Sequence, residues 1–226
     1  MTKVSRIPLR ERQLPAYTRG EEIMNMVTHI VGAALSLPIL IGGVILSAYH
    51  RNPWAIVGSC VYGLTMLWLY TMSSVYHGLG DNIGKRVMQV IDHCTIYALI
   101  AGTYTPILLA AIRPAYPAPA WTIFGCEWGL GLAAAAMTAI DLKKYSRASM
   151  ACYIAMGWLI VLALRPTIET VGMKGFLWLL AGGVAYTVGA VLYGIGRKKR
   201  YFHSVFHVFV LLGSLLQAVC ILFYVL

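Results

Sequence analysis

Long apolar stretches separated by short polar connections constrain this chain more than any other feature of its sequence. They cover residues 24–48, 54–77, 87–111, 120–140, 148–164, 173–195 and 203–226. Most of them come near the length of about 20 residues with which an α-helix crosses a bilayer, and a helix satisfies its own backbone groups in lipid. A transmembrane barrel needs segments that alternate between apolar and polar residues, and such segments are absent. The pattern predicts an all-α integral membrane protein, a seven-transmembrane helix bundle.

The composition agrees with a chain that lies almost wholly in a membrane. Hydrophobic residues make up 59% and charged residues 12% of the sequence, and the mean hydropathy is +0.73, values far from those of soluble domains. We expect one membrane domain over residues 21–226, preceded by a flexible, basic cytoplasmic tail over residues 1–20. The expected location is the cell membrane, which in a bacterium is the cytoplasmic membrane. The sequence indicates no oligomeric state.

The distribution of lysine and arginine predicts the orientation. One side of the membrane would receive the N-terminal tail and the second, fourth and sixth connections, with Lys3, Arg6, Arg10, Arg12, Arg19, Lys85, Arg86, Lys143, Lys144, Arg147, Arg197, Lys198, Lys199 and Arg200. The other side would hold only Arg51, Arg113, Arg165 and Lys174. Because cytoplasmic connections are rich in Lys and Arg, we expect a cytoplasmic N-terminus and a C-terminus outside. Anionic lipid on that side also accounts for the net charge of +10, so membrane lipid, and no nucleic acid, is the expected partner.

A few ionisable residues lie inside the apolar stretches, where each costs about 3 kcal/mol at mid-depth and therefore usually has a partner or a function. They are His29, His77, Asp92, His93, Glu127, His203 and His207. In the predicted orientation all of them except Glu127 lie in the cytoplasmic leaflet. We expect Glu127 to be a neutral or cavity-lining residue of the outer leaflet rather than a catalytic one.

Two of these histidines have the spacing of a metal-binding pair. His203 and His207 are four residues apart and therefore project from one face of a helix. A third imidazole, for which His77 is the natural candidate, would complete the three-ligand pattern of a catalytic zinc site with an open position for water. Asp92 and Ser73 would then hold or deprotonate the water, or bind a substrate carbonyl. The alternative is that the histidines only bond neighbouring helices or reach toward the interface.

Five segments carry a resemblance to a known family. They are "EEIMNMVTH", "SSVYH", "DHCTIYALIAGTYTP", "YIAMGW" and "HSVFHVFVLLGS". Together they resemble the progestin and adipoQ receptor family, specifically its bacterial hemolysin III branch, and the site is similar to that of adiponectin receptors and alkaline ceramidases. The resemblance implies a seven-helix bundle with an intracellular N-terminus and a zinc ion near the cytoplasmic face. The zinc ligands of that pattern fall on His77, His203 and His207, accompanied by Asp92 and Ser73.

One position departs from that pattern, and four others are expected around the site. Gln217 stands where many relatives have a histidine, about 15 Å deeper than His207, so it cannot share the metal. His93 projects about 100° away from Asp92 on a helix and is expected to pack or to support the site. We expect His29, Glu22 and Asn25 to form a polar stripe that braces the mouth of the site without binding the metal.

The sequence leaves three functions open. The leading one is a zinc-dependent intramembrane hydrolase of a lipid amide or ester, in which Asp92 transfers the proton and the apolar interior receives the acyl chain. The second is a non-enzymatic sensor of lipid or membrane state, held together by structural zinc. The third, suggested by the family name, is a pore-forming cytolysin, although the apolar stretches lack the repeated polar face that lines an aqueous pore.

Overall fold

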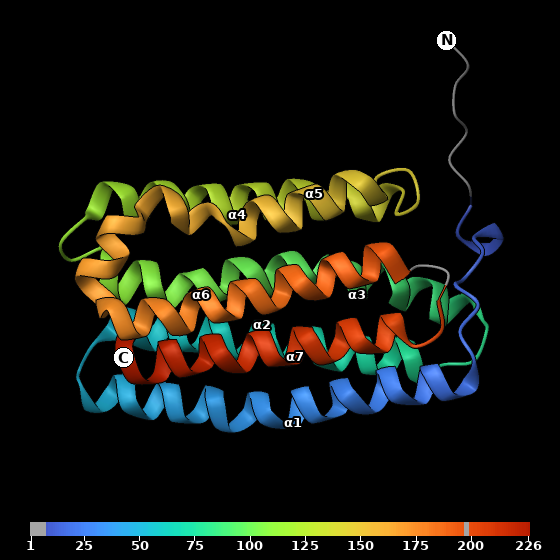
Figure 1. Ribbon diagram of the computed structural model, residues 1–226, viewed down its shortest axis with the longest axis horizontal. Coiled ribbons are helices and arrows are strands. Elements are labelled where there is room, and N and C mark those ends of the chain that lie inside the picture. The colour runs from blue at the N-terminus through green and yellow to red at the C-terminus, as the bar shows by residue number, and fades with distance from the viewer. Residues whose placement is uncertain (1–7, 197–198) are drawn as a thin grey trace, which may run out of the picture.

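The computed structural model describes residues 8–196 and 199–226, which form helices and their connections without any strand (Figure 1). The long helices are α1 (Arg19–Tyr49), α2 (Pro53–Gly78), α3 (Ile83–Pro106), α4 (Pro117–Ile140), α5 (Ser146–Gly157), α6 (Leu164–Gly196) and α7 (Phe202–Cys220). The short 3₁₀ segments are η1 (Leu9–Glu11) and η3 (Leu159–Ala163), and the π-helical segments are η2 (Ile107–Ile112) and η4 (Ile221–Val225).

Within the described part of the chain, six helical runs are long and apolar enough to cross a membrane. The sequence predicts seven apolar stretches, and the difference lies in the run Ser146–Gly196, which contains both 148–164 and 173–195. Inside this run Gly172 has a non-helical backbone, with φ 75° and ψ 160°, which only glycine adopts readily. Figure 1 shows the chain turning back after this point, so that the rest of α6 runs alongside α7.

Polar N-cap side chains determine where α1, α2 and α3 begin. Thr18 and Glu21 form a capping box at α1, and the side chain of Asn52 accepts hydrogen bonds at the start of α2 just before Pro53. Asn82 caps α3 through the backbone N–H of Lys85. These caps satisfy the first N–H groups, which have no intrahelical partner. For that reason α1, α2 and α3 begin one to five residues earlier than the apolar pattern alone predicts.

The interior of the bundle holds aromatic and hydroxyl side chains together with aliphatic ones, and many other large aliphatic side chains face outward. Tyr62 and Tyr70 of α2 are buried, and the Tyr70 hydroxyl donates to Ser214 Oγ of α7 at 2.7 Å. Leu132 and Leu162 are well exposed. An apolar exterior with internally satisfied polar groups is what lipid requires.

One end of the bundle gathers the start of α1, the end of α2 and the start of α7. It lies at the right of Figure 1, and we call it the histidine end. Residues 8–18, the N-terminal strap, run along this end. Arg86 Nε donates to the carbonyl of Arg12 at 3.0 Å, and Arg12 Nη2 donates to the carbonyl of Ile140 at 3.1 Å. The predicted flexibility of residues 1–20 stays a prediction, and residues 1–7, with Lys3 and Arg6, lie outside the described part.

Candidate metal centre

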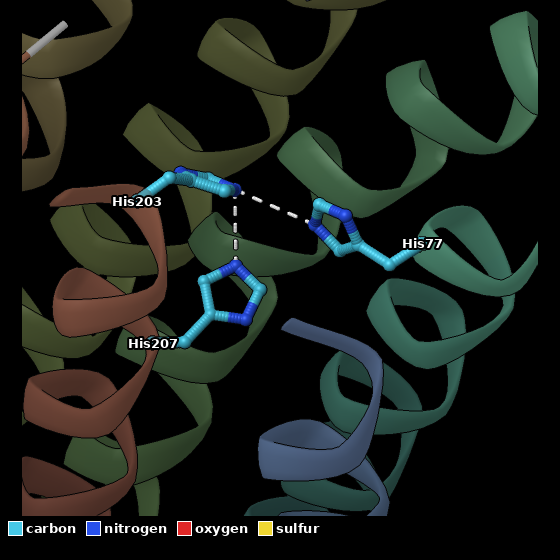
Figure 2. Close-up of side chains that lie close together, drawn as sticks. All are labelled: His77, His203 and His207. Carbon is cyan, nitrogen blue, oxygen red and sulfur yellow. Dashed lines mark hydrogen bonds between the residues drawn. The ribbon is translucent and has the colours of Figure 1, made fainter. Parts of the chain in front are cut away.

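Three imidazoles from two helices converge at the histidine end. His77 comes from the last turn of α2, and His203 and His207 come from the first two turns of α7. Their ring nitrogens face one another in Figure 2, with His203 Nε2 at 3.1 Å from His207 Nε2 and 3.4 Å from His77 Nε2. Each of the three offers a ligand atom within 4.8 Å of the other two. The cluster can therefore hold one metal ion.

The separations fit a small tetrahedral ion. Two nitrogens bound to zinc at about 2.05 Å with a tetrahedral angle lie roughly 3.3 Å apart. The Nε2 separations of His203 from His207 and from His77, 3.1 Å and 3.4 Å, bracket that value. Ca²⁺ and Mg²⁺ prefer oxygen ligands, whereas three imidazoles suit zinc or another late transition metal.

The outer nitrogens of two of the histidines orient their rings. His77 Nδ1 donates to Glu22 Oε2 of α1 at 2.6 Å, and His207 Nδ1 donates to the carbonyl of Asn25 at 3.3 Å. Because a carboxylate and a carbonyl only accept, both rings carry their proton on Nδ1 and turn the Nε2 lone pair toward the cluster. A carboxylate behind a histidine ligand is the usual support of a zinc site.

Helix α1 is joined to this support by two further contacts. Lys85 Nζ donates to Glu22 Oε1 at 2.7 Å, so the carboxylate is held between a buried ammonium and His77. Ser204 Oγ donates to Asn25 Oδ1 at 2.6 Å, which ties α7 to α1. Glu22 and Asn25 thus stand behind the cluster. His29 stacks on His207 with ring centroids 3.8 Å apart, and its two nitrogens have no hydrogen-bond partner among the described residues.

The strap covers the outer side of the cluster. The Tyr17 ring stacks on His203 with centroids 4.9 Å apart and an interplanar angle of 10°. Burial raises the pKa of the Tyr17 hydroxyl well above its usual value, so this hydroxyl stays protonated. His203 Nδ1 has no partner among the described residues. Tyr17 therefore closes the site from the side of the N-terminus.

An apolar cavity of ≈ 150 Å³ extends from the cluster into the bundle. Its lining includes His203, His207, His29, Ser73, Asp92 and His93 at one end, and Gln217 farther along α7. The Ser73 hydroxyl is buried and has no partner among the described residues. Ser73 and Asp92 thus border the same space as two of the clustered histidines.

His93 and Glu127 lie elsewhere in the arrangement. His93 lines the cavity, and its Nδ1 donates to the carbonyl of Gln89 at 2.8 Å and lies 3.6 Å from Asp92 Oδ2. The ring is therefore near Asp92, although the two side chains leave α3 in different directions. Glu127 is fully buried in α4 and lines neither the cavity nor the cluster, and its two carboxylate oxygens have no partner in the described part of the chain.

Three residues around the cluster are not predicted from the sequence. Tyr17 lies in the segment expected to be a flexible tail, Lys85 looks like one more positive charge of a connection, and Ser204 looks like an ordinary helical serine. The only available signal is positional: Tyr17 precedes a capping box, and Ser204 lies between two candidate ligands.

Comparison with known proteins places this arrangement in a family. The sequence model described as "Haemolysin-III related" matches residues 17–218, from the strap through α7. The chain belongs to the hemolysin III family. Hemolysin III proteins are membrane proteins, and together with the six apolar helical runs this makes the chain a multi-pass protein of the cell membrane. The predicted resemblance to the progestin and adipoQ receptor family is confirmed.

Relatives of this hemolysin III protein cover nearly its whole length. Hemolysin-3 of Bacillus cereus is 40% identical over 206 residues, which are 91% of this chain and 92% of the relative. The Hemolysin-3 homolog of Bacillus subtilis (strain 168) is 36% identical over 208 residues, 92% of this chain and 96% of the relative. Monocyte to macrophage differentiation factor of Homo sapiens is 25% identical over 213 residues, 91% of this chain and 84% of the relative.

Proposed function

We propose that this hemolysin III protein is a zinc-dependent hydrolase of a lipid amide or ester. One observation carries the proposal: two of the three converging imidazoles, His203 and His207, border an apolar cavity that is also lined by Ser73 and Asp92. A structural zinc needs four closed positions, whereas a catalytic zinc has three protein ligands. His77, His203 and His207 would hold the ion, and the cavity would receive an acyl chain.

The roles of the polar residues follow from their positions. A zinc ion with three protein ligands supplies a Lewis acid and lowers the pKa of bound water to about 7. Asp92 would take the proton of the attacking water and return it to the leaving nitrogen or oxygen. The water oxygen ends on the acyl carbon, the carbon–nitrogen or carbon–oxygen ester bond breaks, and a fatty acid leaves. Ser73, which has no hydrogen-bond partner among the described residues, would donate to the substrate carbonyl oxygen.

The same proposal includes the topology in the membrane. With a reversal at Gly172 the run Ser146–Gly196 crosses the membrane twice, which gives seven crossings. The described basic residues Arg10, Arg12, Lys85 and Arg86 belong to the histidine end, so the positive-inside rule would place that end in the cytoplasm. The C-terminus would then lie outside.

Metal content and fatty acid release test the proposal. Purified protein should carry about one zinc ion per chain, and the double variant His203→Ala/His207→Ala should lose it while His50→Ala, outside the cluster, keeps it. Zinc-loaded wild type should release fatty acid from at least one lipid amide or ester in a panel that includes ceramide-like lipids. Asp92→Asn should slow the release by about 10²–10⁴-fold, and Asp81→Asn, an exposed control, should not. Zinc-free protein, or equal activity in Asp92→Asn, would overturn the proposal.

A membrane-state sensor with structural zinc is the second candidate. The Glu22 and Asn25 contacts join α1 to the two helices that carry the ligands, so bound zinc would lock three helices together. Full zinc loading without any hydrolysis, combined with unfolding of the histidine variants, would favour this function. Dye leakage from liposomes would instead support the third function, a pore-forming cytolysin, which the names of the bacillary relatives suggest.

A further inference from the structure

A second, polar space lies next to the apolar cavity. This polar chamber, of ≈ 760 Å³, lies between the N-terminal strap and the ends of α3, α5 and α6. Arg12, Gln89, Asp141, Lys143, Arg147 and Tyr193 are among its lining residues. The strap forms one wall from Glu11 to Tyr17, so the chamber depends on the docked position of the strap.

The chamber and the cavity meet at the metal centre. His93, Met150, Tyr193 and His203 line both spaces. His203 is one of the three clustered imidazoles, and Asp92, in the cavity lining, is adjacent to His93. A molecule with an apolar tail and a polar head could therefore occupy both spaces at once, with the bond that joins tail and head beside His203.

The charge of the chamber favours an anionic head. Lys143 and Arg147 are exposed and form no ion pair within the described residues, and Arg12 adds a third cation. Two carboxylates, Asp141 and Glu11, also line the chamber, and Asp141 Oδ1 already accepts from the backbone N–H of Lys144 at 3.0 Å, so the cations outnumber the anions by one. Phosphate and carboxylate groups are the natural partners of such arginine and lysine side chains.

The apolar cavity suits a tail of moderate length. Gln217 lies ten residues after His207 on α7, which is about 15 Å along the helix axis. Three single bonds of an extended chain span about 3.5 Å, so a tail of about twelve carbons reaches from the histidines to Gln217. The cavity therefore accounts for one tail of this length.

We propose that the polar chamber binds the anionic head of a single-chain amphiphile whose tail occupies the apolar cavity, with Lys143 and Arg147 as the residues that select the charge. This inference rests on the proposed hydrolase, for which it names the substrate class: an amide or ester of one long-chain acid whose leaving part carries a phosphate or carboxylate. Hydrolysis would place the fatty acid in the cavity and release the protonated head through the chamber.

Binding, measured separately from hydrolysis, tests the inference. Zinc-loaded protein in nanodiscs of neutral phosphatidylcholine is titrated calorimetrically with dodecyl phosphate, dodecanoate and dodecanol, which share one tail. Wild type should bind at least one of the two anions on the order of tenfold more tightly than the alcohol, since each cation near a membrane surface contributes about 1 kcal/mol. The comparison of phosphate with carboxylate identifies the head.

Removing the charges of the chamber, with a matched control, shows which residues cause the preference for an anionic head. Lys143→Gln/Arg147→Gln should abolish the preference for the anion, and Lys144→Gln/Lys199→Gln, which removes the same charge at the same end outside the chamber, should retain it. Equal affinity for the anions and the alcohol in wild type, or an unchanged preference in the chamber variant, would overturn the inference. Absence of hydrolysis with the expected binding would instead refute the proposed function alone.

Discussion

At the scale of single residues, Glu22 holds the ring of His77 in its orientation. Its carboxylate accepts from His77 Nδ1 at 2.6 Å and from Lys85 Nζ at 2.7 Å. Supporting carboxylates of this kind change metal affinity by about 10–100-fold when they are removed. We predict that Glu22→Gln weakens zinc binding by that factor, measured by competition with a chromophoric chelator.

The control for Glu22 is Glu169→Gln, an exposed carboxylate paired with Arg165 outside the cluster, which should leave zinc affinity unchanged. Because Glu22→Gln leaves the buried Lys85 without its anion, Glu22→Gln/Lys85→Met separates lost folding from lost affinity. Wild-type affinity in both Glu22 variants would contradict the role assigned to this residue.

Ser73 and Ser214 are two buried serines with opposite surroundings. Ser73 Oγ has no partner among the described residues, while Ser214 Oγ bonds the hydroxyls of Tyr70 and Tyr186 at 2.7 and 2.6 Å. Leaving a buried polar group unpaired costs about 1–3 kcal/mol. We predict that Ser73→Ala keeps or raises the free energy of unfolding but slows hydrolysis at least about tenfold. The control variant Ser214→Ala should instead lower the free energy of unfolding by about 1–3 kcal/mol. Denaturant titration in micelles measures the free energy of unfolding of both variants, and the fatty acid assay measures their hydrolysis. A lower free energy of unfolding for Ser73→Ala would show that its hydroxyl has a structural partner.

At the scale of elements, two neighbouring glycines of α6 have different surroundings: one lies at the contact with α7 and the other lines the apolar cavity. A Cβ on Gly182 would lie 2.5 Å from Gln217 Cγ and 3.0 Å from the Gly213 carbonyl oxygen of α7, whereas a Cβ on Gly183 would meet nothing within 4 Å. Gly183 also lines the apolar cavity. Small residues let membrane helices approach closely, so Gly182 belongs to the α6–α7 contact and Gly183 to the cavity.

We predict that Gly182→Ala destabilises the protein by about 1–3 kcal/mol through overpacking, and that Gly183→Leu leaves thermal stability near wild type. Gly183→Leu should instead weaken binding of a dodecyl tail while binding of a hexyl tail changes less, because the added side chain shortens the cavity. Thermal unfolding and calorimetric titration give the two readings. Equal tail preference in Gly183→Leu and wild type would show that the cavity does not hold the tail.

At the scale of the whole molecule, a metal bound by His77, His203 and His207 would join α2 to α7, with α1 behind both. An ion that binds only the folded state stabilises it by about 4 kcal/mol at a thousandfold excess over its dissociation constant. We predict that chelation lowers the thermal midpoint of wild type, that zinc restores it, and that His203→Ala/His207→Ala responds to neither. A midpoint insensitive to chelator would rule out a metal that stabilises the fold.

The topology is a second prediction at this scale. With seven crossings, the strap and the C-terminal residue Leu226 lie on opposite sides of the membrane. We predict that a reporter fused to the N-terminus is active only in the cytoplasm and one fused after Leu226 only outside, because the basic connections stay inside. Reporters on the same side would establish an even number of crossings, and truncation fusions on either side of Gly172 would then show whether the run Ser146–Gly196 crosses once or twice.

The sequence by itself determined the helical membrane fold, the family and the identities of the histidines in the cluster. These properties depend on local or additive quantities: apolar length, four-residue spacing on one helix, and the residues of five short segments. The apolar pattern also separates residues 148–164 from 173–195, but it does not give the form of the break, because Gly172 interrupts α6 through its backbone angles alone.

Only the tertiary structure decided what surrounds the histidines. Glu22 pairs with His77 and Lys85, Tyr17 stacks on His203, and Ser73 lacks a hydrogen-bond partner within residues 8–196 and 199–226. All three features depend on how the helices rotate about their axes and how deeply they pack. Hydropathy and charge position a helix in the membrane but leave its rotation open, since rotation is set by packing against neighbouring helices. The orienting contacts and the two adjoining spaces therefore belong to the fold, while the three clustered histidines were already identified from the sequence.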